Sequence, residues 1–260
     1  MSTYAIGELL RDWRTVRRRS QMDLAHETGV SPRHLSFVEN GRSSPSVELV
    51  LALADGLEVP LRERNALLLA AGYAPRFPHS PLDDPAMERA LSSVERMLRA
   101  HNPYPGVAID RQWNVVSANT AAGALTAGLP AHVAGPPLNV YRACLHPDGL
   151  AARTINFDEF SDYLLGQLRR SVALTGDAEL RALEREVSRY PTIAATPRRP
   201  LGYDRDPSVV VPLRLRTETG EMALFTTLTT FGTPRDVTLD ELAIELFYPA
   251  DDATEAALRG

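Results

Sequence analysis

A short segment that follows Gly29 brings together residue types suited to reading the edges of base pairs. It opens with Ser31, Pro32 and Arg33, and Phe37 stands one helical turn after Arg33. A guanidinium donates two hydrogen bonds to O6 and N7 of a guanine, and an aromatic ring contacts the methyl group of a thymine. The segment therefore has the chemistry of sequence-specific DNA recognition.

The residues around this segment predict a helix-turn-helix. Ala25, Gly29, Leu35 and Val38 are small or apolar, as two helices that cross through a tight turn require. The second helix, capped by Ser31, then lies in the major groove with its N-terminal end against the bases. We expect base-edge contacts from Arg33 and Phe37 and phosphate contacts from Gln21, Asn40, Arg42 and Ser44. The full predicted DNA-facing set is Gln21, Ser31, Pro32, Arg33, His34, Ser36, Phe37, Asn40, Arg42 and Ser44.

The alternative interpretation of the same pattern is an ordinary helix pair without a binding function, whose polar face is solvated. Arg11, Arg14 and Arg18 share one face of the first helix, and their positions fit solvation as well as phosphate contact. The charge distribution limits where a polyanion can bind. The chain has a net charge of −5, and all 28 basic residues are arginine, with a slight basic excess in residues 1–78 only. A nucleic acid must therefore meet a local basic face near the N-terminus.

Residues 1–72 predict five short helices separated by turn signals. The first buries the stripe Ile6, Leu9, Leu10, Trp13 and Val16, and Ser20 and Ser46 are placed to cap later helices. Prolines at 75, 78, 81 and 85 then exclude a regular helix or a central strand. We expect a helix-turn-helix domain over 1–74, a proline-rich linker over 75–85 and a second domain over 86–260.

The second domain mixes helices and strands. Residues 106–110 and 114–119 have the pattern of a β-hairpin, and residues 157–174 and 177–189 have helical stripes. Three further strands are predicted within 209–217, 221–232 and 242–248. Five strands with the helices grouped between them indicate an antiparallel sheet covered on one face. The fold class is therefore a multidomain arrangement of an α domain and an α+β domain.

Several stretches of the sequence resemble one family along nearly the whole chain. "SQMDLAHETGVSPRHLSFVENGRSSPS" is similar to the Xre, or phage-repressor-like, helix-turn-helix. The specific form "SPRHLSFVENGR" followed by "VPLRERNALLLAAGYAP" is similar to the MmyB-like transcription regulators. "PYPGVAIDRQWNVVSAN", "LHPDGLAARTINFDEF" and "TTFGTPRDVTLDELAIELFYPADDATEAALR" resemble the second domain of the MmyB-like transcription regulators. The resemblance implies a bacterial regulator with a PAS-like second domain and an apolar cavity for fatty-acid-like molecules. Phe157, where the family pattern has tryptophan, and Ala143 with Cys144 depart from it.

We expect the predicted cavity to be lined by apolar residues of the central helix and the sheet, although a filled core would use the same types. Arg198, Arg199 and Arg205 are placed where they could clamp a carboxylate, or they are solvated. The predicted ligand-binding residues are Phe160, Leu164, Leu168, Leu213, Phe225, Leu228 and Ile244.

Other polar residues have structural interpretations. Asn119 is predicted to cap a helix, His146 and Asp148 to stand in a turn, and Cys144 to be a buried small side chain. No second histidine or carboxylate cluster stands at metal-ligand spacing beside His146, and no catalytic constellation is apparent. We therefore expect no metal, no cofactor and no enzymatic activity.

The sequence predicts a DNA-binding bacterial transcription regulator that senses a small apolar ligand, a fatty acid or similar acyl compound, and acts as a homodimer on a double-stranded operator. The alternative is an antitoxin-like or scaffold protein whose second domain binds a protein partner; an enzyme acting on an acyl substrate is disfavoured because nucleophile and base are missing. No long apolar run is present and charges begin at Glu8, so we expect a cytoplasmic protein without membrane attachment.

Overall fold

The computed structural model describes residues 5–195, 210–218 and 220–260. The chain divides into two compact units. The first contains residues 1–84 together with 232–240, and the second contains 85–231 and 241–260. Most of the proline-rich segment thus belongs to the N-terminal unit, where Asn65 accepts hydrogen bonds from the backbone N–H groups of Arg76 and Phe77.

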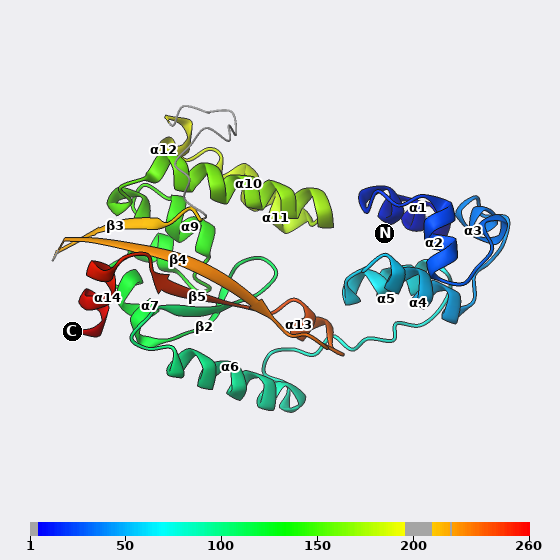
Figure 1. Cartoon of the computed structure of the whole chain (residues 1–260), viewed down its shortest axis with the longest axis horizontal. Helices are drawn as coiled ribbons and strands as arrows, with labels where there is room; N and C mark the ends of the chain where they lie inside the picture. The colour runs from blue at the N-terminus through cyan, green and yellow to red at the C-terminus, as the bar shows by residue number, and fades with distance from the viewer. Residues whose placement is uncertain (1–4, 196–209, 219) are drawn as a thin grey trace. The chain divides into compact units, whose positions relative to one another are not determined.

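The N-terminal unit contains the five predicted helices, shown in blue and cyan in Figure 1. The predicted caps are confirmed: the Ser20, Ser31 and Ser46 side chains each accept a hydrogen bond from a backbone N–H in the first turn of their helix. Gly29 adopts a left-handed conformation with φ of 71°, which turns the chain between the second and third helices. The helices are α1 (Ile6–Val16), α2 (Gln21–Glu27), α3 (Pro32–Glu39), α4 (Val47–Gly56) and α5 (Leu61–Ala70).

The core of this unit forms where the apolar stripes of the helices meet. Leu10, Leu24, Ala25 and Val38 are completely buried there. One prediction about the stripe of α1 is wrong, because the Val16 side chain, at the last residue of the helix, is 43% exposed.

Residues 232–240, which connect two strands of the other unit, complete the N-terminal unit. They include the short helix α13 (Val237–Asp240), and the Val237 N–H donates to the Pro78 carbonyl at 2.8 Å. The Asp240 carboxylate accepts a hydrogen bond of 2.8 Å from the Leu61 N–H. Pro60 at the N-cap of α5 provides no side-chain cap, so Asp240 supplies it from a distant part of the sequence.

The C-terminal unit is built on a five-stranded sheet in the order β2-β1-β5-β4-β3. All neighbouring strands are antiparallel, as predicted. Successive side chains along each strand point to opposite faces of the sheet, so the two faces have different environments. The strands are β1 (Gly106–Ile109), β2 (Val115–Ala118), β3 (Leu213–Thr217), β4 (Gly220–Thr230) and β5 (Ala243–Pro249).

Helices lie against both faces of this sheet, so the prediction that one face is covered is wrong. Leu98 of α6 meets the face that carries Leu246 at Gly106, where no side chain separates them. Phe160 and Leu164 of α10 belong to the core on the opposite face, and Figure 1 shows α6 and α10 on either side of the strands. The helices of this unit are α6 (Glu88–Ala100), α7 (Thr120–Thr126), α8 (Ala131–Ala134), α9 (Val140–Leu145), α10 (Phe157–Thr175), α11 (Ala178–Val187), α12 (Pro191–Ala194) and α14 (Asp252–Arg259), with 3-10 turns at Pro85–Met87 and Leu150–Arg153.

None of the helices in the described ranges combines the length and the apolar character needed to span a membrane.

Candidate functional site

Helix α3 buries one side and exposes its N-terminal end. Leu35 and Val38 face the core, with at most 1% of their surface accessible. Ser31, Pro32 and Arg33 are exposed, as a helix that enters a groove requires. Of the other predicted contact residues, Asn40, Arg42 and Ser44 are exposed, and Gln21, His34, Ser36 and Phe37 are partly exposed.

Arg33 and Phe37 lie together on the outer side of α3. The Arg33 guanidinium carbon is 5.4 Å from the centre of the Phe37 ring, which is a cation–π contact. This contact holds the guanidinium near the helix without using its N–H donors. Both proposed base-contacting groups therefore belong to one surface.

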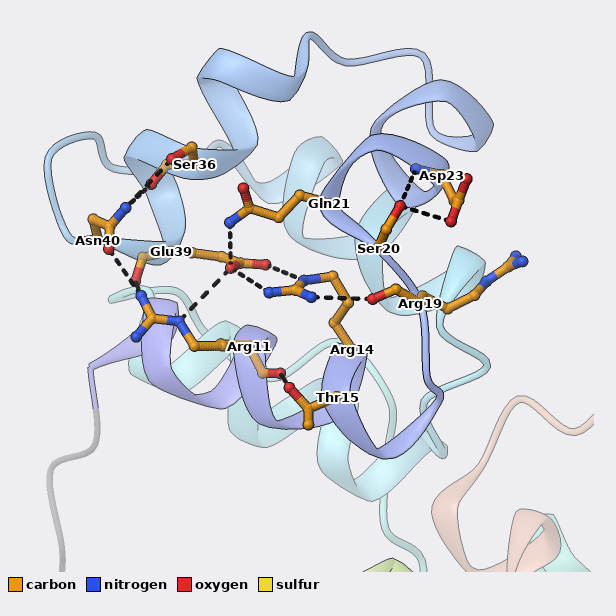
Figure 2. A network of polar contacts seen from close by, with 10 residues as sticks. All are labelled: Arg11, Arg14, Thr15, Arg19, Ser20, Gln21, Asp23, Ser36, Glu39 and Asn40. Carbon is orange, nitrogen blue, oxygen red and sulfur yellow. Dashed lines mark hydrogen bonds and ion pairs between the residues drawn. The ribbon is translucent and has the colours of Figure 1, made fainter.

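A buried carboxylate joins α3 to the two helices before it (Figure 2). The Glu39 side chain has no accessible surface, and its two oxygens accept hydrogen bonds of 2.7 and 2.9 Å from Arg14. Gln21 donates a further hydrogen bond of 2.7 Å to the same carboxylate. Helices α1, α2 and α3 are thereby connected by one set of charge-assisted hydrogen bonds.

Arg11 extends this set toward the end of α3. Its guanidinium donates to the Glu39 carbonyl at 3.0 Å and to Asn40 Oδ1 at 2.9 Å. Helices α1 and α3 can approach closely at this point because Gly7 has no side chain. A Cβ atom at Gly7 would lie 2.5 Å from the Glu39 carbonyl oxygen. Arg11 and Arg14 are therefore bound internally, while Arg18 is exposed.

The environment of Glu39 lowers its pKa. Burial favours the neutral acid and raises the pKa, but hydrogen bonds from Arg14 and Gln21 and the charges of Arg14 and Arg11 together outweigh it. Glu39 is therefore a carboxylate, and each charge in this cluster has a partner. Sequence analysis did not identify Glu39; the available signal was an acid among the predicted DNA-facing residues of one helix.

The C-terminal unit contains a cavity of about 410 Å³ between α10 and the sheet. This volume lies in the range of small-molecule sites, which are mostly apolar with a few polar groups. Four of the seven predicted ligand-binding residues line it: Phe160, Leu164, Leu213 and Leu228.

The other three predicted ligand-binding residues do not line this cavity. Leu168 is completely buried in the core next to it. Phe225 and Ile244 lie on the opposite face of the sheet, where Phe225 stacks on Tyr248. Strand alternation explains this error, because Phe225 and Leu228 are three positions apart and cannot share a face.

The same alternation turns Glu245 and Phe247 into the cavity. Glu245 is a residue that sequence analysis missed, because choosing Ile244 as a lining residue assigns Glu245 to the wrong face. Burial raises the pKa of Glu245 to about 7, against a lowering hydrogen bond from the Thr226 hydroxyl. Burial also raises the pKa of the cavity-lining Cys144 thiol to about 12, which favours the neutral thiol, and Cys144 is the buried side chain that was predicted.

The smaller predictions have mixed outcomes. Asn119 caps α7 by accepting from the Ala122 N–H, as predicted. His146 and Asp148 stand in a turn, but the statement that no second histidine is nearby is wrong. The fold brings His132 Nε2 to 2.9 Å from Asp148 Oδ2, with His146 Nδ1 at 3.9 Å from the same oxygen. His132 and Asp148 are exposed, and exposed pairs contribute little to stability. Arg198, Arg199 and Arg205 lie outside the described residues.

Comparisons with known proteins match both units. A model of the MmyB-like transcription regulator ligand binding domain matches residues 91–260, and a helix-turn-helix domain model matches residues 5–67. None of the curated proteins compared with the chain matches it.

Solved structures also show similarity to the chain. The clp gene regulator ClgR from Corynebacterium glutamicum is 25% identical, with 40% of this chain and 96% of that chain covered and a TM-score of 0.24. An RNA-binding light-oxygen-voltage receptor is 15% identical, with 97% and 60% covered and a TM-score of 0.28.

Proposed function

The chain belongs to the MmyB-like transcription regulators, and from this premise we propose a regulator whose DNA affinity changes when the C-terminal unit binds an apolar ligand. A helix-turn-helix domain and a ligand-binding domain on one chain make it a DNA-binding transcription regulator. The finer parts of the proposal concern which residues contact DNA, what the ligand is, and how the chain assembles.

The observation that supports the DNA-binding surface is the exposure of the first turn of α3. Arg33 is free to donate two hydrogen bonds to a guanine, and the Phe37 ring lies one turn further along the same surface. Ser31, Pro32, His34 and Ser36 complete the proposed base-facing part of the surface.

Phosphate contacts are proposed for the residues at the edges of this surface. Arg42 and Ser44 are exposed after the end of α3. Gln21 and Asn40 are held in place by Glu39 and Arg11, so any phosphate they contact meets side chains whose positions are already fixed. Such contacts set the register of the protein on DNA without reading sequence.

The cavity supports a small apolar ligand. Its lining is mostly apolar, and an interior volume of about 410 Å³ fits a small molecule better than a protein partner, which needs an exposed surface. The proposed ligand is a fatty acid or a similar acyl compound, bound by Phe160, Leu164, Leu213 and Leu228.

Assembly and coupling complete the proposal. A single recognition helix reads few base pairs, so a homodimer would bind two half-sites about 10 base pairs apart, or a multiple of that spacing. The ends of residues 232–240 continue into β4 and β5, which line the cavity, while the segment itself belongs to the N-terminal unit. A ligand that shifts these strands would thereby act on the DNA-binding unit.

A selection experiment tests the function. The full chain is used to enrich binding sites from a random DNA pool, and its affinity for the enriched site is measured with and without decanoic acid or decan-1-ol. We expect one two-fold related site and a ligand-dependent change in affinity of about fivefold or more. Failure to enrich any sequence would overturn the assignment of α3 as a reading helix.

A further inference from the structure

Two buried polar atoms in the described part of the C-terminal unit have no hydrogen-bond partner. They are Glu245 Oε2 and the Tyr141 hydroxyl. Buried polar atoms in folded proteins nearly always have partners, so an exception indicates a function or an absent group. The two residues also interact, because the Glu245 charge is one of the causes that raise the pKa of Tyr141.

Glu245 lines the cavity from the central strand of the sheet. It is on the central strand β5, directly between Val107 of β1 and Leu228 of β4, and both neighbours line the same cavity. Aromatic residues surround the space that it faces: Trp113, Phe160 and Tyr163. Glu245 is the only charged side chain among the described residues that line the cavity.

No described cation neutralises this carboxyl. The groups that titrate near it are Tyr141 and Cys144 from α9, with Tyr163 of α10 and Arg170 of the same helix acting on Tyr141. Strands β1 and β4 contribute only uncharged side chains beside it, and the Thr226 hydroxyl is its one polar contact within the described parts of the chain. The pKa of Glu245 is about 7, so both protonation states are populated near neutral pH.

We propose that Glu245 is the polar anchor for the ligand, and that the ligand is an apolar chain ending in a hydroxyl or an amide. This inference rests on the apolar ligand of the proposed function and replaces the carboxylic acid head group of a fatty acid with a neutral one. The anchor is a ligand-positioning group and takes part in no reaction.

Hydrogen-bond capacity decides between the possible head groups. An ionised carboxylate only accepts, so it pairs with Glu245 only when Glu245 is protonated. An ammonium group only donates, so it pairs only with the ionised form. A hydroxyl or a primary amide both donates and accepts, and it therefore pairs with Glu245 in either state. A ligand of this kind also avoids placing a second negative charge in an apolar cavity.

The test compares four ligands that share one chain and differ in the head group. Decan-1-ol, decanamide, decanoate and decylamine are titrated into the full chain by calorimetry, below their aggregation thresholds, at about pH 6 and about pH 8. We expect the alcohol and the amide to bind at least about tenfold more tightly than decanoate at the higher pH. Decanoate should bind more tightly at the lower pH, where Glu245 is protonated.

Two variants locate the effect. Glu245→Gln removes the negative charge and supplies both a donor and an acceptor at every pH, so the preference for decanamide over decanoate should shrink and lose its pH dependence. Glu221→Gln makes the same change at an exposed position of β4, where the partner is Arg214, and should leave the preference unchanged. The wild-type pH dependence is informative even if the first variant folds poorly.

The outcomes separate this inference from the proposed function. Equal affinity for decanoate and decanamide at about pH 8, or tightest binding of decylamine, would overturn the neutral head group while the apolar ligand stands. An unchanged preference in a folded Glu245→Gln protein would overturn the anchor. If none of the four compounds binds at either pH, the apolar ligand itself is wrong, and the anchor with it.

Discussion

One glutamate in each unit lies in a different environment from the other. Glu39 in the N-terminal unit receives hydrogen bonds from Arg14 and Gln21, and its pKa is lowered. Glu245 in the C-terminal unit has an oxygen without a partner among the described residues, and its pKa is raised to about 7. A saturated polar cluster fixes the relative positions of helices, whereas an unsatisfied one leaves hydrogen-bonding capacity for another molecule. The proposed DNA-binding surface thus lies on a unit whose buried carboxylate has its partners, and the proposed ligand site lies beside a carboxyl that has an unpartnered oxygen among the described residues.

The first prediction concerns removal of the Glu39 carboxylate, which binds Arg14 and Gln21 in the N-terminal unit. Glu39→Ala leaves Arg14 partly buried without its partner, and it also releases Gln21. We expect a loss of about 3 kcal/mol in the free energy of unfolding, at the lower end for breaking a buried pair because Arg14 keeps some solvent access. Chemical denaturation measures this loss.

A matched control uses an exposed pair in the same unit. Glu27→Ala breaks the ion pair between Glu27 and Arg19, whose two side chains are each more than 40% exposed. This change should lower the free energy of unfolding by at most about 1 kcal/mol. Equal losses in the two variants would contradict a special role for Glu39.

Because the pKa of Glu39 is lowered, its contribution to the stability of the fold is present above the ordinary glutamate pKa and disappears as the pH falls through the folded-state pKa.

The second prediction has the opposite pH dependence. Glu245 has a raised folded-state pKa, so the folded protein binds more protons than the unfolded chain between the ordinary value and about 7. Stability should therefore fall as the pH rises from about 4.5 to about 7, by no more than about 3 to 4 kcal/mol from this group. The difference between wild type and Glu245→Gln, measured by denaturation across this range, isolates the effect from other carboxyl groups. A flat difference would show that Glu245 is solvated.

The third prediction concerns occupation of the cavity, either by a ligand or by a larger side chain. A saturating ligand at about 100 times its dissociation constant should stabilise the protein by about 2.7 kcal/mol, which thermal unfolding with decan-1-ol measures. Ala122→Leu adds side-chain volume at a residue that lines the cavity, so the same ligand concentration should give a smaller shift. An undiminished shift would mean that the ligand binds elsewhere.

The fourth prediction concerns the outer surface of the N-terminal unit. Arg33→Ala should weaken binding to the specific site by about 1 to 3 kcal/mol and relax the preference for one base pair, with the fold unchanged. Arg89→Ala removes an equal charge from an exposed position of α6 and is the control for net charge. Fluorescence anisotropy with the enriched site and with single-base variants measures both effects. Wild-type affinity of Arg33→Ala for its site would place the base contacts elsewhere.

The features predicted correctly from the sequence depend on residues that are close together in the chain. Examples are the helix caps at Ser20, Ser31 and Ser46 and the turn at Gly29. The exposure of Arg33 follows from the helical period, which fixes its position relative to Leu35 and Val38. The five strands were predictable because each has its own apolar pattern and turn signals.

The features that were missed require long-range information. Arg14 and Glu39 are 25 positions apart, and nothing in the spacing indicates that their helices cross. The strand containing Glu245 is apolar on nearly every side chain, so its pattern does not reveal which face meets the cavity. The pairing of His132 with Asp148 likewise depends on how two separate segments fold together.

The last prediction concerns residues 232–240. These residues belong to the N-terminal unit by their contacts, although in the sequence they lie between two strands of the C-terminal unit. Asp240→Ala removes the cap on Leu61 at the start of α5, which should cost about 1 kcal/mol in stability. Asp55→Ala, which removes an exposed partner of Arg64, is the control and should cost less. If residues 232–240 transmit the ligand signal, Asp240→Ala should keep its affinity for DNA without ligand but lose much of the ligand-dependent change. A full ligand response in a destabilised Asp240→Ala protein would show that coupling takes another route, because the cap would then be purely structural.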